Sequence, residues 1–234
     1  MRILINIIIF QILEILPLMA GNYLQLAEKY EKEGNYSTAI SNYINAINQD
    51  IGNYKLYNKV ALLYEKTGNK QRAKDYFVRS IIINNEYMEG YYNLGLWYYN
   101  QEKFIEAAIN FKRALSLSQD EPRLYNALIN CYIKIKKIQP AIQILDKALK
   151  KFPKNYKILN LAGIIYLFQK NYKKAEKYFR EALKYQEDDK LINNLGVTLY
   201  LAGKKNEAKK LLTKIKKYDK IEENIKLIEG GRTK

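Results

Sequence analysis

The chain has 234 residues, of which 48% are hydrophobic and 27% charged, so it can bury a core and is not expected to be disordered. It contains no His and a single Cys, Cys131. The commonest general base and metal ligand is therefore missing, and one Cys cannot form an internal disulfide or a thiolate metal site. We expect a protein that is not an enzyme and needs no cofactor or metal, with Cys131 as a core thiol.

The formal net charge of +16 is confined to one half of the chain. Residues 1–121 carry 13 basic and 13 acidic side chains, whereas residues 122–234 carry 27 basic and 11 acidic ones. Such an asymmetry favours an acidic partner for the basic half, which could be an acidic peptide, a nucleic acid or an anionic membrane. The alternative is that Lys fills solvated helix faces in a chain generally rich in Ile, Asn, Tyr and Lys.

Residues 1–20, MRILINIIIFQILEILPLMA, begin with Arg2 and continue as an apolar run to Ala20. A basic start, an apolar stretch and a small residue at its end are typical of a signal peptide or membrane anchor. This segment predicts an exported or membrane-anchored protein. In the alternative, the segment is an amphipathic cap on a cytoplasmic protein, because its polar residues fall within one helical arc of about 140°. These residues are Asn6, Gln11 and Glu14.

From residue 20 onward the sequence repeats with a period of 34 residues. One column holds Tyr30, Tyr64, Tyr98, Tyr132 and Tyr166, and another holds Ala39, Ala73, Ala107, Ala141 and Ala175. A sixth repeat follows one residue early, with Gly196 and Ala208. Self-similarity at a period of this size is typical of a solenoid, in which each repeat buries its apolar face against its neighbours.

Within each repeat, apolar and small residues recur at spacings of three and four, which is the periodicity of an α-helix. A short breaker separates the two helical stretches: Gly34-Asn35, Gly68-Asn69, Gln101-Glu102, Lys136-Lys137, Lys170-Asn171 and Gly203-Lys204. Gly or Asn just past a helix commonly adopts the left-handed conformation that ends it. We therefore predict helix–turn–helix repeats, with small residues where the two backbones approach closely.

Two stretches resemble the tetratricopeptide repeat: YYNLGLWYYNQEKFIEAAINFKRALSLSQDEP at 91–122 and LAGIIYLFQKNYKKAEKYFREALKY at 161–185. The resemblance covers about residues 20–222 and departs from the family pattern at Ile129, which replaces a small residue. It implies an all-α, right-handed superhelical solenoid that forms one domain of about six repeats. The repeats are expected near 20–53, 54–87, 88–121, 122–155, 156–188 and 189–222.

A capping helix is expected after the last repeat, over 219–230, followed by a short tail at 231–234. Asp219 and Glu222 form a start that is similar to a capping box, and Gly230 and Gly231 end the apolar stripe. A solenoid needs such a terminal element with one polar face.

The resemblance implies that the first helices of successive repeats line a concave groove. Four of these helices carry a basic residue and an Asn three positions later, on one face of the helix: Lys55 and Asn58, Arg123 and Asn126, Lys157 and Asn160, Lys190 and Asn193. We include Asn130, one turn beyond Asn126, in the same surface. Amides can bond the backbone of an extended peptide, and the basic residues favour a carboxylate.

Some arrays of this family bind C-terminal carboxylates through a Lys and an Asn one turn apart in the first repeat. The corresponding positions here are Leu24 and Glu28, so this mode is not expected.

The resemblance and the charge together predict a protein–protein interaction scaffold that binds an acidic or extended peptide in the groove of its basic C-terminal half. A helical-repeat nucleic-acid binder is the first alternative, although the groove positions are repetitive Asn and the aromatic residues belong to the packing columns. A membrane-tethered assembly factor is the second, and it differs from the scaffold mainly in membrane contact through residues 1–20.

Overall fold

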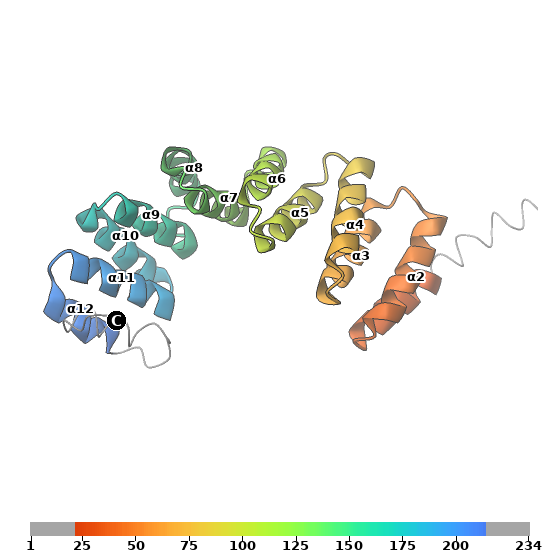
Figure 1. The fold of residues 1–234 in the computed structure, drawn as a ribbon, viewed down its shortest axis with the longest axis horizontal. Coiled ribbons are helices and arrows are strands. Elements are labelled where there is room, and N and C mark those ends of the chain that lie inside the picture. Colours follow the sequence, from red (N-terminus) through yellow and green to blue (C-terminus); the bar gives the residue numbers. More distant parts are fainter. Residues whose placement is uncertain (1–21, 214–234) are drawn as a thin grey trace, which may run out of the picture. The chain divides into compact units, whose positions relative to one another are not determined.

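The computed structural model describes residues 22–213, and within this range it contains helices and no strand (Figure 1). The chain divides between Lys103 and Phe104 into two compact units. None of the helices described is long and apolar enough to cross a membrane. The expectations for residues 1–20, for the capping helix at 219–230 and for the tail at 231–234 lie outside the described residues.

Unit 1 contains two helix pairs and the first helix of a third pair. A helix over 22–32 is followed by α2 (Tyr36–Gln49), α3 (Tyr54–Lys66), α4 (Lys70–Ile83) and α5 (Met88–Asn100). Unit 2 begins with the second helix of that pair. Its helices are α6 (Phe104–Leu117), α7 (Pro122–Lys134), α8 (Ile138–Lys151), α9 (Tyr156–Phe168), α10 (Tyr172–Tyr185), α11 (Asp189–Leu201) and α12 (Lys205–Leu212).

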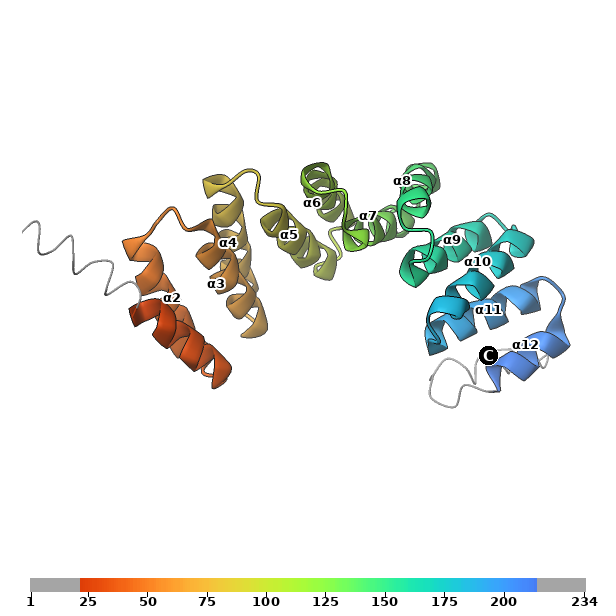
Figure 2. The ribbon, with the colours of Figure 1, turned by 180° about the vertical axis from the view of Figure 1, so that it is seen from behind.

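Helices that follow one another in the chain also pack side by side within each unit, as for α3 with α4 and α9 with α10 (Figure 2). The expected all-α fold of helix–turn–helix repeats is confirmed.

The turn inside each repeat has the same backbone conformation. One residue per turn has a positive φ of 57° to 82°: Gly34, Gly68, Glu102, Lys136, Lys170 and Gly203. The N–H of the next residue then donates to a carbonyl five residues earlier, at 2.8 to 2.9 Å. In the first five repeats this carbonyl belongs to the tyrosine column, as in the bond from Asn35 to Tyr30. This is the Schellman arrangement, and it ends each first helix where the breakers predict.

Asparagine after the turn begins the second helix in three repeats. The side chains of Asn35, Asn69 and Asn171 each accept a hydrogen bond from the backbone N–H three residues later. This bond satisfies one of the otherwise unpaired donors of the first helical turn. Lys137 and Lys204 occupy the same position before α8 and α12, where no side-chain cap bond forms.

The alanine column lies at the centre of the helix pairs. All five of its alanines are fully buried, and the position four residues later is buried as well. That position holds Tyr43, Phe77, Phe111, Leu145 and Phe179. Cys131 is also buried, which confirms the expected core thiol, and burial raises the pKa of Cys131 to about 12.

Small residues of the first helices receive the large side chains of the second helices. A Cβ built on Gly163 would lie 2.5 Å from Cε1 of Phe179, and one on Gly196 would lie 2.5 Å from Cδ2 of Leu212. The two contacts have the same sequence separation, so the sixth repeat keeps this packing although it begins one residue early.

We predict that Gly163→Ala lowers the free energy of unfolding by roughly 1–3 kcal/mol, because the Phe179 ring is fully buried and has to move. Chemical denaturation of the full chain measures this change. Gly52→Ala is the matched control, because its Cβ would make only an ordinary 3.6 Å contact with Asp50. Equal losses from the two substitutions would contradict the packing register.

Candidate functional site

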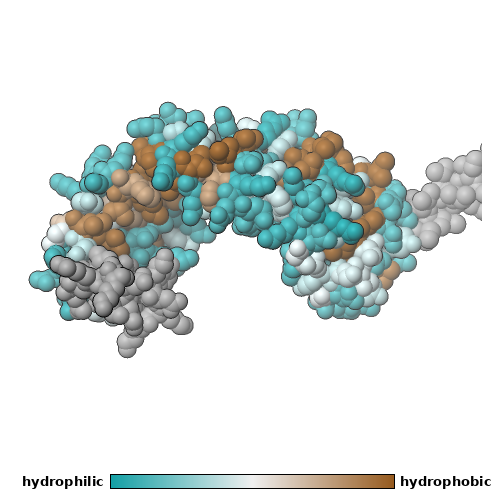
Figure 3. Space-filling model, viewed as in Figure 1, coloured by the Kyte–Doolittle hydropathy of each residue, from teal (hydrophilic) through white to brown (hydrophobic). Residues whose placement is uncertain are grey.

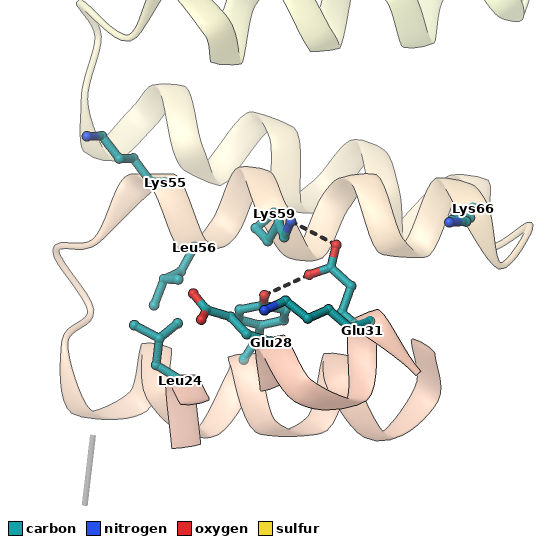
Figure 4. A pocket seen from close by; sticks show the side chains of 9 residues that line it. Leu24, Glu28, Glu31, Lys55, Leu56, Lys59 and Lys66 are labelled. Carbon is teal, nitrogen blue, oxygen red and sulfur yellow. Dashed lines mark hydrogen bonds and ion pairs between the residues drawn. The ribbon is translucent and has the colours of Figure 1, made fainter. Parts of the chain in front are cut away.

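A cleft of about 560 Å³ lies in unit 1 between the helix over 22–32 and α3, which are the first helices of successive repeats (Figure 4). The side chains that line it are Leu24, Glu28, Glu31, Lys32, Tyr43, Lys55, Leu56, Lys59 and Lys66. Leu24 and Leu56 point toward one another at one end, and Lys66 lies at the other end (Figure 4). The cleft therefore combines an apolar end with a predominantly basic wall.

Glu31 is the organising residue of this cleft. One carboxylate oxygen pairs with Nζ of Lys59 at 2.8 Å, and the other accepts a hydrogen bond from the buried Tyr43 hydroxyl at 2.8 Å (Figure 4). Partial burial alone would raise the pKa of Glu31. The hydrogen bonds from Lys59 and Tyr43, together with the charges of Lys59 and Lys66, outweigh burial, so the pKa of Glu31 lies below its ordinary value.

The lowered pKa means that the folded state favours charged Glu31. Its contribution to stability is therefore present above the ordinary pKa of 4.5 and is lost as the pH falls through the lower folded-state pKa. We predict that Glu31→Gln lowers the unfolding free energy at neutral pH, and that the difference from the unmodified chain shrinks in acid. Denaturant titrations across this pH range measure the difference.

Glu33→Gln is the control for this experiment. Glu33 is half exposed and lies 4.0 Å from Lys29, and exposed pairs of this kind contribute little. A difference between Glu31→Gln and the unmodified chain that stays constant from neutral to acid pH would contradict the assigned role of Glu31.

The lysines of the cleft are engaged to different extents. Lys59 pairs with Glu31, and Nζ of Lys66 lies 4.3 Å from the ring centre of Tyr36. Lys32 and Lys55 are exposed. Because Lys55 and Lys32 stand near the apolar end and the rim, the cleft can accept a carboxylate next to an apolar side chain. Lys55 is the only predicted site residue among those that line this cleft.

Asparagine side chains link the first helices of neighbouring repeats in both units. In unit 1, Nδ2 of Asn93 on α5 donates to Oδ1 of Asn58 on α3 at 3.0 Å. In unit 2, Nδ2 of Asn194 on α11 donates to Oδ1 of Asn160 on α9 at 2.9 Å. Two of the predicted groove asparagines thus hold adjacent repeats together.

The remaining predicted asparagines differ from this pattern. Asn58 is 7% exposed, so it presents little surface to a partner. Asn130 donates to the backbone oxygen and Oδ1 of Asn126 within α7. The sequence interpretation selected Asn193, whereas the bond to Asn160 is made by Asn194, which follows Asn160 at the full period of 34 residues. Asn93 and Asn194 were both missed, and each stands two residues before the small residue of its helix.

The predicted basic residues are not equivalent. Lys55, Lys157 and Lys190 are exposed at the starts of α3, α9 and α11. Arg123 is partly buried and forms an ion pair with Glu121 just before α7. Arg123 therefore already has an acidic partner. Within residues 22–213, no three side chains of the types His, Cys, Asp and Glu gather to hold a metal ion.

Sequence models described as the tetratricopeptide repeat match residues 54–87, 98–162 and 136–195, more than half of the chain. The chain belongs to the tetratricopeptide repeat family. The resemblance noted in the sequence is thereby confirmed, and proteins of this family generally mediate protein–protein interactions and are generally not enzymes.

Among relatives of this tetratricopeptide chain, a BBSome complex member BBS4 homolog from Drosophila melanogaster is 24% identical over 169 residues. The match covers 72% of this chain and 35% of that protein, so the chain spans about a third of the length of this curated relative.

Two solved structures share the fold. The PilF protein of Pseudomonas aeruginosa superposes with a TM-score of 0.74 at 15% identity, covering 93% of this chain and 99% of that one. YrrB, described as a tetratricopeptide protein with an unusual peptide-binding site, has a TM-score of 0.60 at 19% identity. That match covers 74% of this chain and 89% of YrrB. At these identities the likeness concerns the fold alone.

Proposed function

We propose that this protein is a non-catalytic scaffold that binds an extended, acidic segment of a protein partner along the first helices of its repeats. The observation that carries the proposal is the amide pair of α9 and α11. Their mutual bond uses Oδ1 of Asn160 and Nδ2 of Asn194, and Nδ2 of Asn160 and Oδ1 of Asn194 have no other partner among residues 22–213. One donor and one acceptor side by side match the N–H and C=O of a peptide backbone.

The charge beside this amide pair supports an acidic segment. Lys157 precedes Asn160 by three residues and Lys190 precedes Asn194 by four, so each cation lies on the same helix face as its amide. Both lysines are exposed. A carboxylate of the partner next to the bound backbone would meet these charges, which favours association and its specificity.

The named relatives agree with a scaffold in general terms. One is described as a complex member and another as a protein with a peptide-binding site. The family is generally non-enzymatic, and the sequence contains no His, so we assign no catalytic step. Nucleic acid remains the second partner class that the basic half would attract, through phosphate contacts without sequence preference.

We predict that Lys157→Glu together with Lys190→Glu weakens peptide binding severalfold, because both charges flank the amide pair. Peptides are selected against the full chain from a random displayed library, and the affinity of the best is measured by fluorescence anisotropy. Replacing Asn160 and Asn194 together by Ala should weaken the same peptide further, since the backbone bonds are lost.

The control variant is Lys173→Glu with Lys177→Glu, which places the same charge change on exposed positions of α10. It should leave the affinity close to that of the unmodified chain and change mainly its salt dependence. Equal effects of the two double variants would show general attraction to a basic surface. Tighter binding of random single-stranded oligonucleotides than of any selected peptide would favour the nucleic-acid class.

We further propose that residues 1–20 direct the chain to a membrane, either as a cleaved signal or as a retained anchor, and we keep the amphipathic cap as the competing assignment. The basis is Arg2 followed by an apolar run that ends at Ala20. We predict that a chain starting at Gly21 keeps the full unfolding midpoint of the repeats. Recovery of the intact chain from the cytosol of the native cell, or a lower midpoint for the shortened chain, would favour the cap.

A further inference from the structure

A second cleft, of about 210 Å³, lies in unit 2 among the second helices rather than the first. Leu115 of α6 and Ile144 of α8 form its apolar walls, and Leu128 and Tyr132 of α7 lie between them. Leu128 is buried, whereas Leu115, Tyr132 and Ile144 are partly exposed. Hydrophobic residues gather over α6, α7 and α8 between hydrophilic ones (Figure 3).

The repeat pattern explains why there is a cleft at this place. In two other repeats, the tyrosine column of the first helix faces a tyrosine of the second helix. Tyr64 lies 5.5 Å from Tyr76, and Tyr166 stacks on Tyr178 at 5.4 Å with an interplanar angle of 5°.

In the fourth repeat the corresponding residues are Tyr132 and Ile144, because both tyrosine pairs recur at multiples of 34 residues. An isoleucine cannot cover the ring face as a second aromatic ring does. Within residues 22–213, Tyr132 has no aromatic partner, and the cleft lies beside its ring. The cleft thus occupies the place of a ring that two other repeats supply themselves.

Two lysines stand at this cleft on opposite walls. Lys112 on α6 and Lys147 on α8 are exposed and line it. Neither has an ion pair or ring contact among the described residues. An occupant that carries carboxylates beside an apolar group would meet both charges.

We propose that this cleft binds an aromatic side chain of a protein partner, flanked in the partner's sequence by carboxylates. The ring replaces the missing tyrosine over Tyr132, since aromatic rings prefer stacked or edge contacts with one another. The carboxylates pair with Lys112 and Lys147. The volume is below the roughly 300 Å³ at which small-molecule pockets begin, so it suits one side chain rather than a separate ligand.

This docking site is separate from the groove of the proposed function, because it lies between α6 and α8, which are second helices, and shares no residue with the amide pair. A partner could therefore use it with or without the groove. Failure of one site leaves the other unaffected, and the two are tested with different probes.

The test is an NMR titration of the full chain, labelled at Ile and Leu methyl groups, with the peptide acetyl-Asp-Phe-Asp-amide. We expect saturable shifts of the Leu115, Leu128 and Ile144 methyl signals, which a bound ring displaces. Replacing Phe by Ala in the peptide should weaken binding by about tenfold, since the stacked ring is lost. Replacing both Asp by Lys should weaken it as well.

Ile144→Tyr is the decisive variant, because it supplies the ring that repeats two and five carry at this position. It should keep the unfolding midpoint and lose peptide binding by at least about tenfold. Ile105→Tyr is the matched control, since Ile105 is 61% exposed on α6 and does not line the cleft. This control should bind the peptide as the unmodified chain does.

Lys112→Glu with Lys147→Glu provides an independent variant that leaves the apolar walls intact. It should bind acetyl-Lys-Phe-Lys-amide better than the Asp-flanked peptide. Unchanged binding by Ile144→Tyr, equal binding of the Ala peptide, or no saturable shift in the unmodified chain would each overturn the proposal. A concentration-dependent dimer that disappears in Ile144→Tyr would also overturn it and assign the cleft to a second copy of the chain.

Discussion

The contact between a small residue on one helix and a large side chain on the next holds each repeat together. Where Gly163 meets Phe179 there is no room for a single additional carbon, and Gly196 meets Leu212 in the same way. Close packing of this kind fixes the distance and rotation of the two helices, because interiors have few voids. The left-handed turn and the separation of 16 residues between the contact partners follow from this geometry. Side chains on the remaining faces are then free to differ from repeat to repeat.

The candidate sites use that freedom in different ways. On the first helices, the Asn160 and Asn194 side chains join two repeats and retain one donor and one acceptor between exposed lysines. In unit 1, Glu31 is held by Lys59 and Tyr43 and gives the cleft between two first helices a fixed polar centre. On the second helices, the fourth repeat lacks the ring that would close its surface. An array with a uniform scaffold therefore presents chemically distinct surfaces along its length.

The sequence was sufficient for the fold because the fold depends on interactions that recur at one period. The left-handed turns, the buried alanine column, the core position of Cys131 and the packing of Gly163 all follow from residues in fixed columns. The sites depend on contacts between columns. The bonds of Asn93 and Asn194 run diagonally, from two residues before one small residue to three residues before another, so reading single columns did not reveal them. The unit 1 cleft was missed for the same reason, because Glu31 and Lys59 belong to different columns and different repeats.

The turns of successive repeats carry unequal strain. Gly68 adopts its positive φ without a Cβ penalty, and Asn69 then caps α4. Lys136 adopts the same conformation with a side chain, and α8 begins after it without a cap bond. Local opening therefore requires less free energy at α8 than at α4, and amide hydrogens should exchange sooner there. In a linear array with contacts only between neighbours, such a point sets where unfolding begins and how far it spreads before the remaining repeats lose support.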